Sequence, residues 1–277
     1  MPNRKRQKTT RAVSQWAYCC VSPRITTRRT VVSTLAAAAA AAALPRSPVA
    51  MSLSAPARPK LLIFDVNETL LDLGKLQRAV NQEFESEFAF RQWFSLLLQY
   101  SLVDTVTGHY HDFPVIGAAG LDMLAQALGQ PARPAARKKE LLDLLAELPP
   151  HPDVVPALTA LQHAGFRMVA LTNSPGPTVQ KQMAYAQLTP FFEQLLSIDA
   201  QRRYKPHPDT YAAACRQLRV APADAMLLAA HGWDVAGARH AGLQAAFIAR
   251  PGQQQYPLAP APTLVGPTLE AVAQQLV

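Results

Sequence analysis

Cysteine is scarce in this sequence, and its scarcity excludes two ways of holding a protein together. The 277 residues include three cysteines. Cys19 and Cys20 are adjacent near the N-terminus, and Cys215 stands alone in the rest of the chain. Cysteines placed in this way support neither a disulfide framework nor a thiolate metal site. A hydrophobic core must therefore stabilise the fold, and a chain of this length with 49% hydrophobic residues can bury one.

Acidic residues are absent from the first 59 positions, which hold ten arginines and lysines. The whole chain has 27 basic and 19 acidic residues, so by subtraction residues 60–277 carry 17 basic and 19 acidic residues and a net charge of −2. The formal charge of +8 therefore comes from the N-terminal segment. The rest has no excess of positive charge to follow a phosphate backbone, and we expect no nucleic-acid partner.

No apolar run reaches the roughly 20 residues that a membrane-spanning helix needs, so we expect no membrane span. The N-terminal segment has another order: Arg28 and Arg29 precede an alanine run at 36–43, which is followed by prolines and small residues. This order resembles a twin-arginine export signal and would make the protein periplasmic. Two alternatives are an over-long gene start, with translation of a cytoplasmic protein from Met51, and an organellar transit peptide. Under each of them residues 1–59 are a leader outside the folded part, and we expect it to be disordered.

From residue 60 onward, short apolar runs alternate with amphipathic stretches. This alternation predicts an α/β fold with a Rossmann-like parallel sheet, whose strands are buried on both faces. The expected strands are 60–65, 167–173, 193–199, 225–231 and 244–250, and the expected helices are 153–164, 176–187, 208–218 and 234–241. A short strand and a helix are expected within 262–277.

A segment of another kind interrupts this alternation after the first strand. Residues 75–100, 113–129 and 136–147 have helical periodicity, and no convincing strand lies among them. We therefore expect a core domain of residues 60–74 and 150–277 with an inserted all-helical cap domain of residues 75–149. An insertion at this point would lie over the carboxyl ends of the strands, where open parallel sheets bind their ligands.

Polar side chains follow four of the predicted strands. An aspartate at a strand end is often only a turn or helix cap, so none of these residues alone indicates a site. Strand ends of a parallel sheet meet at one edge, however, and we expect the six side chains to converge there. They are Asp65, Thr172, Asn173, Lys205, His231 and Asp234.

Four spaced motifs carry these residues: "FDVNETL" (64–70), "LTNSP" (171–175), "YKPHPDTY" (204–211) and "AAHGWDVAGARHAGL" (229–243). In this order they resemble the haloacid dehalogenase superfamily over residues 60–277. The tyrosine six residues after Lys205, and the "WD" followed by "GA", resemble its L-2-haloacid dehalogenase (type II) branch. The resemblance implies a metal-independent hydrolase without cofactors that acts on short 2-halocarboxylic acids, and a homodimer is compatible with it.

The residue chemistry separates this branch from the phosphatases of the superfamily. Phosphatases resemble D-x-D at the first motif, where the second aspartate protonates the leaving group. Here that position is Asn67, which cannot act as a general acid. Ala230 stands where a magnesium-binding aspartate is usual, so Mg²⁺ would be poorly held. A halide leaves without a proton, and carbon–halogen cleavage therefore suits this residue set.

The resemblance implies a role for each residue in a two-step mechanism. Asp65 would attack the halogen-bearing carbon to form an ester, which water then hydrolyses. Lys205 would keep Asp65 ionised, and Asp234 would orient Lys205 or help to activate water. Substrate contacts are expected from Asn67, Thr69, Thr172, Asn173 and Tyr211, and from the cap residues Trp93, Phe94 and Tyr100.

The sequence departs from the branch in two ways. The arginine that usually follows the cap tryptophan and binds the halide is replaced by Phe94, and Arg91 could take its role only if the helix rotated. The usual asparagine and glycine are replaced by His231 and Glu68. We expect Glu68 to hold the His231 ring, so that His231 is the general base for ester hydrolysis. The alternative is a solvated Glu68 and a His231 that bonds only to backbone.

Two other functions stay open at the level of sequence. One is a magnesium-dependent small-molecule phosphatase. The other is a catalytically silent scaffold that binds small carboxylates or a protein partner through its cap. A metal site elsewhere is not indicated, because the remaining histidines show no ligand spacing with acids, and "GHYHDF" (108–113) is more typical of cap packing than of a zinc site.

Overall fold

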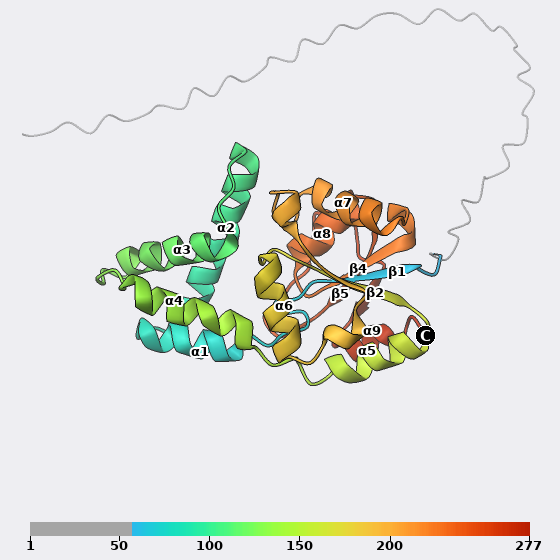
Figure 1. Cartoon of the computed structure of the whole chain (residues 1–277), viewed down its shortest axis with the longest axis horizontal. Helices are drawn as coiled ribbons and strands as arrows, with labels where there is room; N and C mark the ends of the chain where they lie inside the picture. The colour runs from blue at the N-terminus through green and yellow to red at the C-terminus, as the bar shows by residue number, and fades with distance from the viewer. Residues whose placement is uncertain (1–56) are drawn as a thin grey trace, which may run out of the picture. The chain divides into compact units, whose positions relative to one another are not determined.

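A six-stranded sheet forms the centre of the molecule (Figure 1). The computed structural model describes residues 57–277, and the predicted leader lies outside these residues. All neighbouring strands are parallel, in the order β3-β2-β1-β4-β5-β6. The strands are β1 (Leu61–Phe64), β2 (Arg167–Thr172), β3 (Gln194–Ser197), β4 (Ala225–Ala229), β5 (Gln244–Ile248) and β6 (Leu264–Gly266). The predicted α/β class and parallel sheet are thereby confirmed.

Helices cover both faces of the sheet, which explains why the strands read as continuous apolar runs. Leu62 and Phe64 of β1 face a cluster with α5 (Val154–His163), α6 (Gly176–Tyr185) and α9 (Leu269–Ala273). Leu61 and Ile63 face the other cluster, with α7 (Pro208–Leu218) and α8 (Gly232–His240). Figure 1 shows α7 and α8 on one side of the strands and α5 and α9 on the other.

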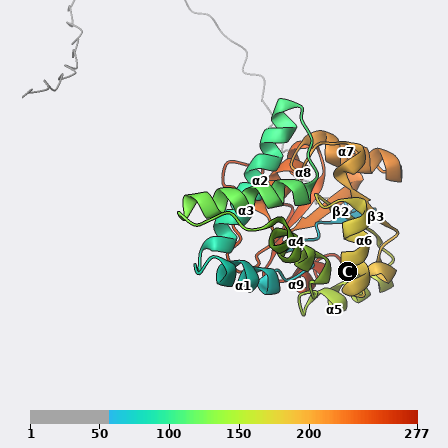
Figure 2. The same ribbon diagram turned by 60° about the vertical axis from the view of Figure 1, so that its left-hand side comes forward.

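The segment proposed as a cap (residues 75–149) contains helices and no strand, and it lies beside α6 (Figures 1 and 2). Its helices are α1 (Gly74–Glu83), α2 (Ala89–Thr107), α3 (Phe113–Ala127) and α4 (Ala135–Asp143). Short 3-10 helices are Leu144–Glu147, Thr189–Phe191, Ile198–Ala200 and Pro222–Asp224. The single helix predicted over 75–100 is wrong, because residues 84–88 separate α1 from α2 and Glu85 has a left-handed φ of 50°.

Hydrogen bonds join the helical segment to the sheet domain on both sides of the strand ends. On α6, the buried Gln182 donates to Asn67 in the loop after β1 and to the carbonyl of Leu145. Beyond α2, Tyr110 donates to Asp199 after β3. These contacts hold the helices over the carboxyl ends of the central strands. Within the part of the chain that the structure describes, no helix has the length and apolarity needed to span a membrane.

Candidate active site

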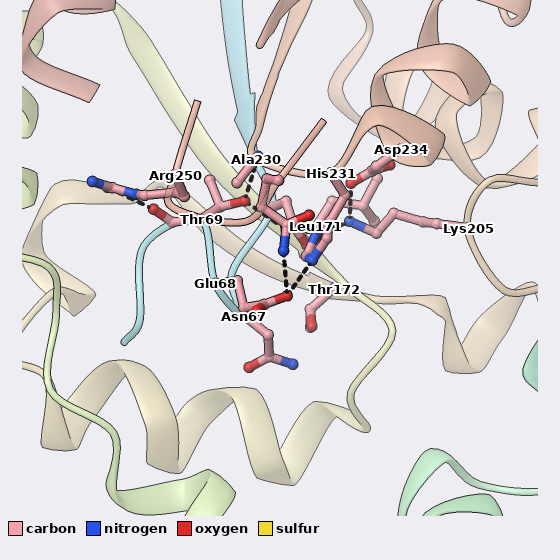
Figure 3. Close-up of polar contacts among 12 residues, drawn as sticks. Asn67, Glu68, Thr69, Leu171, Thr172, Lys205, Ala230, His231, Asp234 and Arg250 are labelled. Atoms are coloured by element: carbon pink, nitrogen blue, oxygen red, sulfur yellow. Dashed lines mark hydrogen bonds and ion pairs between the residues drawn. The ribbon is translucent and has the colours of Figure 1, made fainter. Parts of the chain in front are cut away.

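Three adjacent strands deliver their polar ends to one place. Asp65 directly follows β1, and Thr172 ends β2. His231 and Asp234 follow β4, while Lys205 reaches in from the loop between β3 and α7. Figure 3 shows Lys205 next to Asp234 and His231 close to Glu68. The convergence expected from the strand ends is found among these residues.

The Asp65 carboxylate accepts three hydrogen bonds. Lys205 Nζ lies 2.8 Å from Oδ1, while Thr69 Oγ1 lies 2.7 Å and His231 Nδ1 3.2 Å from Oδ2. Burial alone would raise the pKa of this carboxyl, but the charge of Lys205 and the bond from His231 outweigh burial and hold the pKa well below its usual range. Asp65 is therefore an ionised, oriented carboxylate, as a nucleophile must be.

Lys205 uses all three of its ammonium protons inside the protein. Its Nζ donates to Asp65, to Asp234 at 2.6 Å and to the carbonyl of Leu171 at 3.0 Å. Burial opposes its charge, yet Asp234 and Asp65 raise its pKa overall. Gly237 lets α8 come this close, since a Cβ there would lie 2.4 Å from the Cβ of Pro206. Lys205 thus positions Asp65 and has no proton left for a substrate.

Asp234 and Tyr211 lie beneath the site and have no access to it. Both side chains are fully buried, and the Tyr211 hydroxyl donates to the Asp234 carboxylate. The expectation that Tyr211 contacts the substrate is therefore corrected, because its hydroxyl donates to Asp234. Of the two roles expected for Asp234, the structure supports the orientation of Lys205.

His231 bridges two carboxylates. Its Nδ1 faces Asp65, and its Nε2 lies 2.6 Å from Glu68 Oε2. Burial would lower its pKa, but the bonds to Asp65 and Glu68 raise it to about 9. The ring also stacks against Trp233 and Phe94, at centroid distances of 5.0 and 6.4 Å. His231 is therefore an imidazolium at neutral pH, and it cannot take a proton while Asp65 is ionised.

Glu68 keeps its position against a conformational cost. Its φ of 62° lies in the left-handed region, which residues other than glycine adopt only at a cost of about 1 kcal/mol. Its carboxylate accepts from His231 and, at 3.2 Å, from Gln253 in the loop after β5. Backbone strain of this kind persists where surrounding contacts hold the residue in place, and it is concentrated at functional sites. The structure thus brings Glu68 and His231 together, as expected for a dyad.

The smaller polar residues Thr69, Thr172 and Asn173 differ in their hydrogen-bond partners. Thr69 donates to Asp65 and accepts from the N–H of Ala230, so it orients the nucleophile. Thr172 accepts from the N–H of Ser174, and Asn173 accepts from the N–H of Lys205. Their remaining donors, the Thr172 hydroxyl and the Asn173 amide, lie one strand away from Asp65.

Asn67 points away from this group, as Figure 3 shows. Its amide oxygen accepts from Gln182 at 2.9 Å, and its nitrogen is directed at Ser174. The expected substrate contact of Asn67 is therefore corrected, because its amide oxygen bonds to Gln182 of α6 and its nitrogen bonds to Ser174 after β2.

A cavity of about 320 Å³ opens beside His231. Phe94 lines it, as expected, together with Arg91 of the same helix face. Trp93 does not reach it, since its side chain is fully buried and donates to the carbonyl of Gly117. Tyr100 lines a different groove, between α2 and α3. Trp93 and Tyr100 are thus corrected to residues of the cap, away from the cavity.

Three residues at the site were not expected from the sequence. Trp233 stacks on His231, Gln253 bonds to Glu68, and Arg250 donates to the carbonyl of Thr69 at 2.9 Å. Trp233 lies inside the fourth motif and could have been found there. Arg250 and Gln253 follow β5 and carry no pattern of their own. Among residues 57–277, no group of three or more histidine, cysteine or acidic side chains is arranged to hold a metal ion.

Comparison with known proteins gives consistent matches. Residues 59–242 match the model of the haloacid dehalogenase-like hydrolase family. (S)-2-haloacid dehalogenase 1 of Pseudomonas sp. strain CBS-3 is 32% identical over 201 residues, which cover 72% of this chain and 88% of that protein. The (S)-2-haloacid dehalogenase of Xanthobacter autotrophicus is 30% identical over 198 residues, or 70% of this chain and 77% of that protein.

Solved structures agree with these relatives. The L-2-haloacid dehalogenase of Xanthobacter autotrophicus superposes with a TM-score of 0.74 and 27% identity, covering 79% of this chain and 98% of that one. A second structure of that enzyme, with chloropropionic acid covalently bound, gives a TM-score of 0.73 at 26% identity and the same coverage.

Proposed function

Because the chain belongs to the haloacid dehalogenase-like hydrolase family, we propose that it hydrolyses short 2-haloacids to 2-hydroxy acids and halide through an ester on Asp65. The observation that carries this proposal is the Asp65 carboxylate, held ionised by Lys205, Thr69 and His231. The position that supplies a general acid in phosphatases is Asn67, which faces the cap junction. The site thus has an oriented nucleophile and no acid at the place where a phosphate ester would need one.

In the first step an Asp65 oxygen attacks the carbon that bears the halogen. A carbon–oxygen bond forms, the carbon–halogen bond breaks with both electrons on the halogen, and halide leaves without a proton. Thr172 and Asn173 hold the substrate carboxylate with the Thr172 hydroxyl and the Asn173 amide nitrogen, next to the attacked carbon. Phe94 and the ring of His231 form the wall of the cavity beside it.

The second step depends on the loss of charge at Asp65. Once Asp65 is an ester, its negative charge no longer holds the proton on His231 Nδ1, and this proton passes to solvent. The neutral imidazole, oriented by Glu68, then takes a proton from water, which attacks the ester carbonyl. The product alkoxide leaves and is protonated by the Asp65 carboxylic acid formed with it. One water is consumed, and one halide and one proton are released overall.

Two findings support this route. Two relatives at 32% and 30% identity are named for (S)-2-haloacids, and the Xanthobacter autotrophicus enzyme has been solved with chloropropionic acid covalently bound. His231 bonds to the nucleophile through Nδ1 and to Glu68 through Nε2. Loss of the Asp65 charge on esterification would therefore lower the pKa of His231 directly.

The test is halide release in the presence of EDTA. We expect the (S) enantiomer of 2-chloropropionate to yield chloride and lactate in equal amounts, and Asp65→Asn to abolish both. Phosphate release from phosphate esters that EDTA stops would instead indicate the magnesium-dependent phosphatase. Binding of 2-chloropropionate without turnover in the unaltered protein would indicate the silent scaffold.

A further inference from the structure

We propose that Arg91 forms a subsite for a second anionic group of the substrate, at a distance from the 2-halo acid head. The inference rests on the proposed function, since it names the substrate class of the same cavity. It would make the protein selective for 2-halo diacids over 2-halo monoacids of equal length.

The first step of the argument is that the buried cations of the site are already engaged. Lys205 gives its three protons to Asp65, Asp234 and Leu171. His231 uses both ring nitrogens on Asp65 and Glu68. Neither side chain can bind a further anion without giving up a carboxylate.

Arg91, in contrast to Lys205 and His231, is not bonded to a carboxylate among residues 57–277. It lines the cavity, and its side chain has no hydrogen-bond or ion-pair partner among residues 57–277. On α2 it shares one helix face with Phe94, Ser95 and Leu98, because residues three, four and seven apart lie on the same side. No rotation of the helix is needed to bring Arg91 to the cavity, which corrects the expectation from sequence.

The surroundings of Arg91 are polar as well. Ser95 on the same helix and Gln77 on α1 also line the cavity, and within residues 57–277 neither side chain has a partner. A guanidinium, a hydroxyl and an amide together offer the donors that a carboxylate accepts. The cap wall of the cavity is therefore equipped for an anion.

The rest of the lining is mixed. Phe90, Phe94, Leu98 and Trp233 supply apolar surface, while Glu68, His231 and Gln253 are polar. The volume of about 320 Å³ is at the lower end of the range for cavities that hold drug-sized molecules, which exceeds the need of a two- or three-carbon acid. A cavity of this volume that carries a guanidinium together with apolar side chains can accommodate an acid with a second anionic group on an alkyl chain.

The carboxylate next to the halogen has its own donors. It is attached to the carbon that Asp65 attacks, so it must lie beside Asp65. Thr172 and Asn173 there accept from backbone N–H groups, and among residues 57–277 no acceptor is bonded to the Thr172 hydroxyl or the Asn173 amide nitrogen. Arg91 is thereby left for a group farther along the substrate.

The experiment compares 2-bromoadipate with 2-bromohexanoate, which have the same number of carbons and differ in the distal carboxylate. We expect kcat/KM to favour the diacid by about tenfold to a hundredfold, the range of one charge-assisted hydrogen-bonded contact. Arg91→Met should remove this preference. Arg78→Met is the matched control, because Arg78 is an exposed cap arginine outside the cavity, and its loss changes the net charge equally.

Calorimetry with the two products, 2-hydroxyadipate and 2-hydroxyhexanoate, reads the subsite without turnover. Tighter binding of the diacid that is lost in Arg91→Met and kept in Arg78→Met supports the proposal. If this result is found but no bromide is released, the subsite is supported and the proposed function is not. Equal binding of the two products overturns the proposal. So does an Arg91→Met change that weakens both products equally, because Arg91 would then serve the carboxylate next to the reacting carbon.

Discussion

At the scale of single residues, substitutions of Glu68 should affect the stability of the protein and its rate of ester hydrolysis differently. Its backbone is left-handed, a conformation that glycine adopts freely, so Glu68→Gly should relieve about 1 kcal/mol of strain that Glu68→Gln retains. Both variants remove the carboxylate behind His231. We expect both to slow ester hydrolysis at least about a hundredfold, the usual contribution of a general base.

Intact-mass measurement after mixing with 2-chloropropionate checks this prediction. Both variants should accumulate an adduct on the protein, and the glycine variant should unfold at a midpoint no lower than the glutamine variant. Steady turnover without an adduct in Glu68→Gln would show that the Glu68 carboxylate is dispensable.

The charge of His231 makes a prediction about pH and stability. Its pKa is raised in the folded protein from 6.5 to about 9, so its stabilising contribution is complete below pH 6.5, declines as pH rises, and is lost above about pH 9. Urea unfolding of the unaltered protein and of His231→Asn at pH 6 and pH 10 measures it. The difference between the two proteins should shrink at pH 10. A difference that is constant with pH would mean that the ring is neutral in the free enzyme.

At the scale of elements, the loop after β5 ties the first motif to the rest of the domain. Arg250 is buried and donates to Asp153 at 2.7 Å and to the carbonyl of Thr69. Arg250→Met would leave both acceptors without their partner, and we expect a loss of about 3 kcal/mol in the free energy of unfolding. Arg167→Met is the matched control, because its ion pair with Glu193 is half exposed and should cost less than about 1 kcal/mol. Equal losses would show that Arg250 has no special structural role.

Helix α2 shows what could and could not be predicted for an element. Periodicity placed the helical segment correctly, but the break at 84–88 contains neither glycine nor proline and gave no signal. Trp93, Phe94 and Arg91 were identified as neighbours in sequence, whereas their roles depend on which face of α2 meets α3 and which meets the cavity. That choice is made by packing with distant residues such as Gly117.

At the scale of the whole molecule, the parallel sheet was predictable because its strands are apolar on both faces and alternate with helices. The polar strand ends then followed from the geometry of parallel sheets, and Asp65, Lys205, His231 and Asp234 do meet. The partners of buried polar side chains were not predictable. From the sequence, Tyr211 and Asn67 look like substrate contacts, whereas in the fold Tyr211 bonds to Asp234 and Asn67 bonds to Gln182.

The N-terminal segment gives a prediction at this scale. Among residues 57–277, the hydrogen bonds described for the site join residues 65–253, all of which are retained in a chain that starts at Met51. We expect that chain to keep the kcat/KM and the melting temperature of the full chain. Parallel kinetics and thermal unfolding of the two chains measure this. A shorter chain that folds equally well but turns over more slowly would assign the leader a part in catalysis. The division into a core and a cap, and the homodimer, stay predictions.

The central claim is that Asp65 attacks the substrate and is later restored by water. A single turnover of 2-chloropropionate in ¹⁸O-water, followed by mass measurement of the peptide that contains Asp65 and of the lactate, tests it most directly. The account predicts one ¹⁸O in the Asp65 carboxylate and none in the new hydroxyl of the lactate. Labelled lactate together with an unlabelled Asp65 peptide would contradict it, because water would then have attacked the substrate carbon itself.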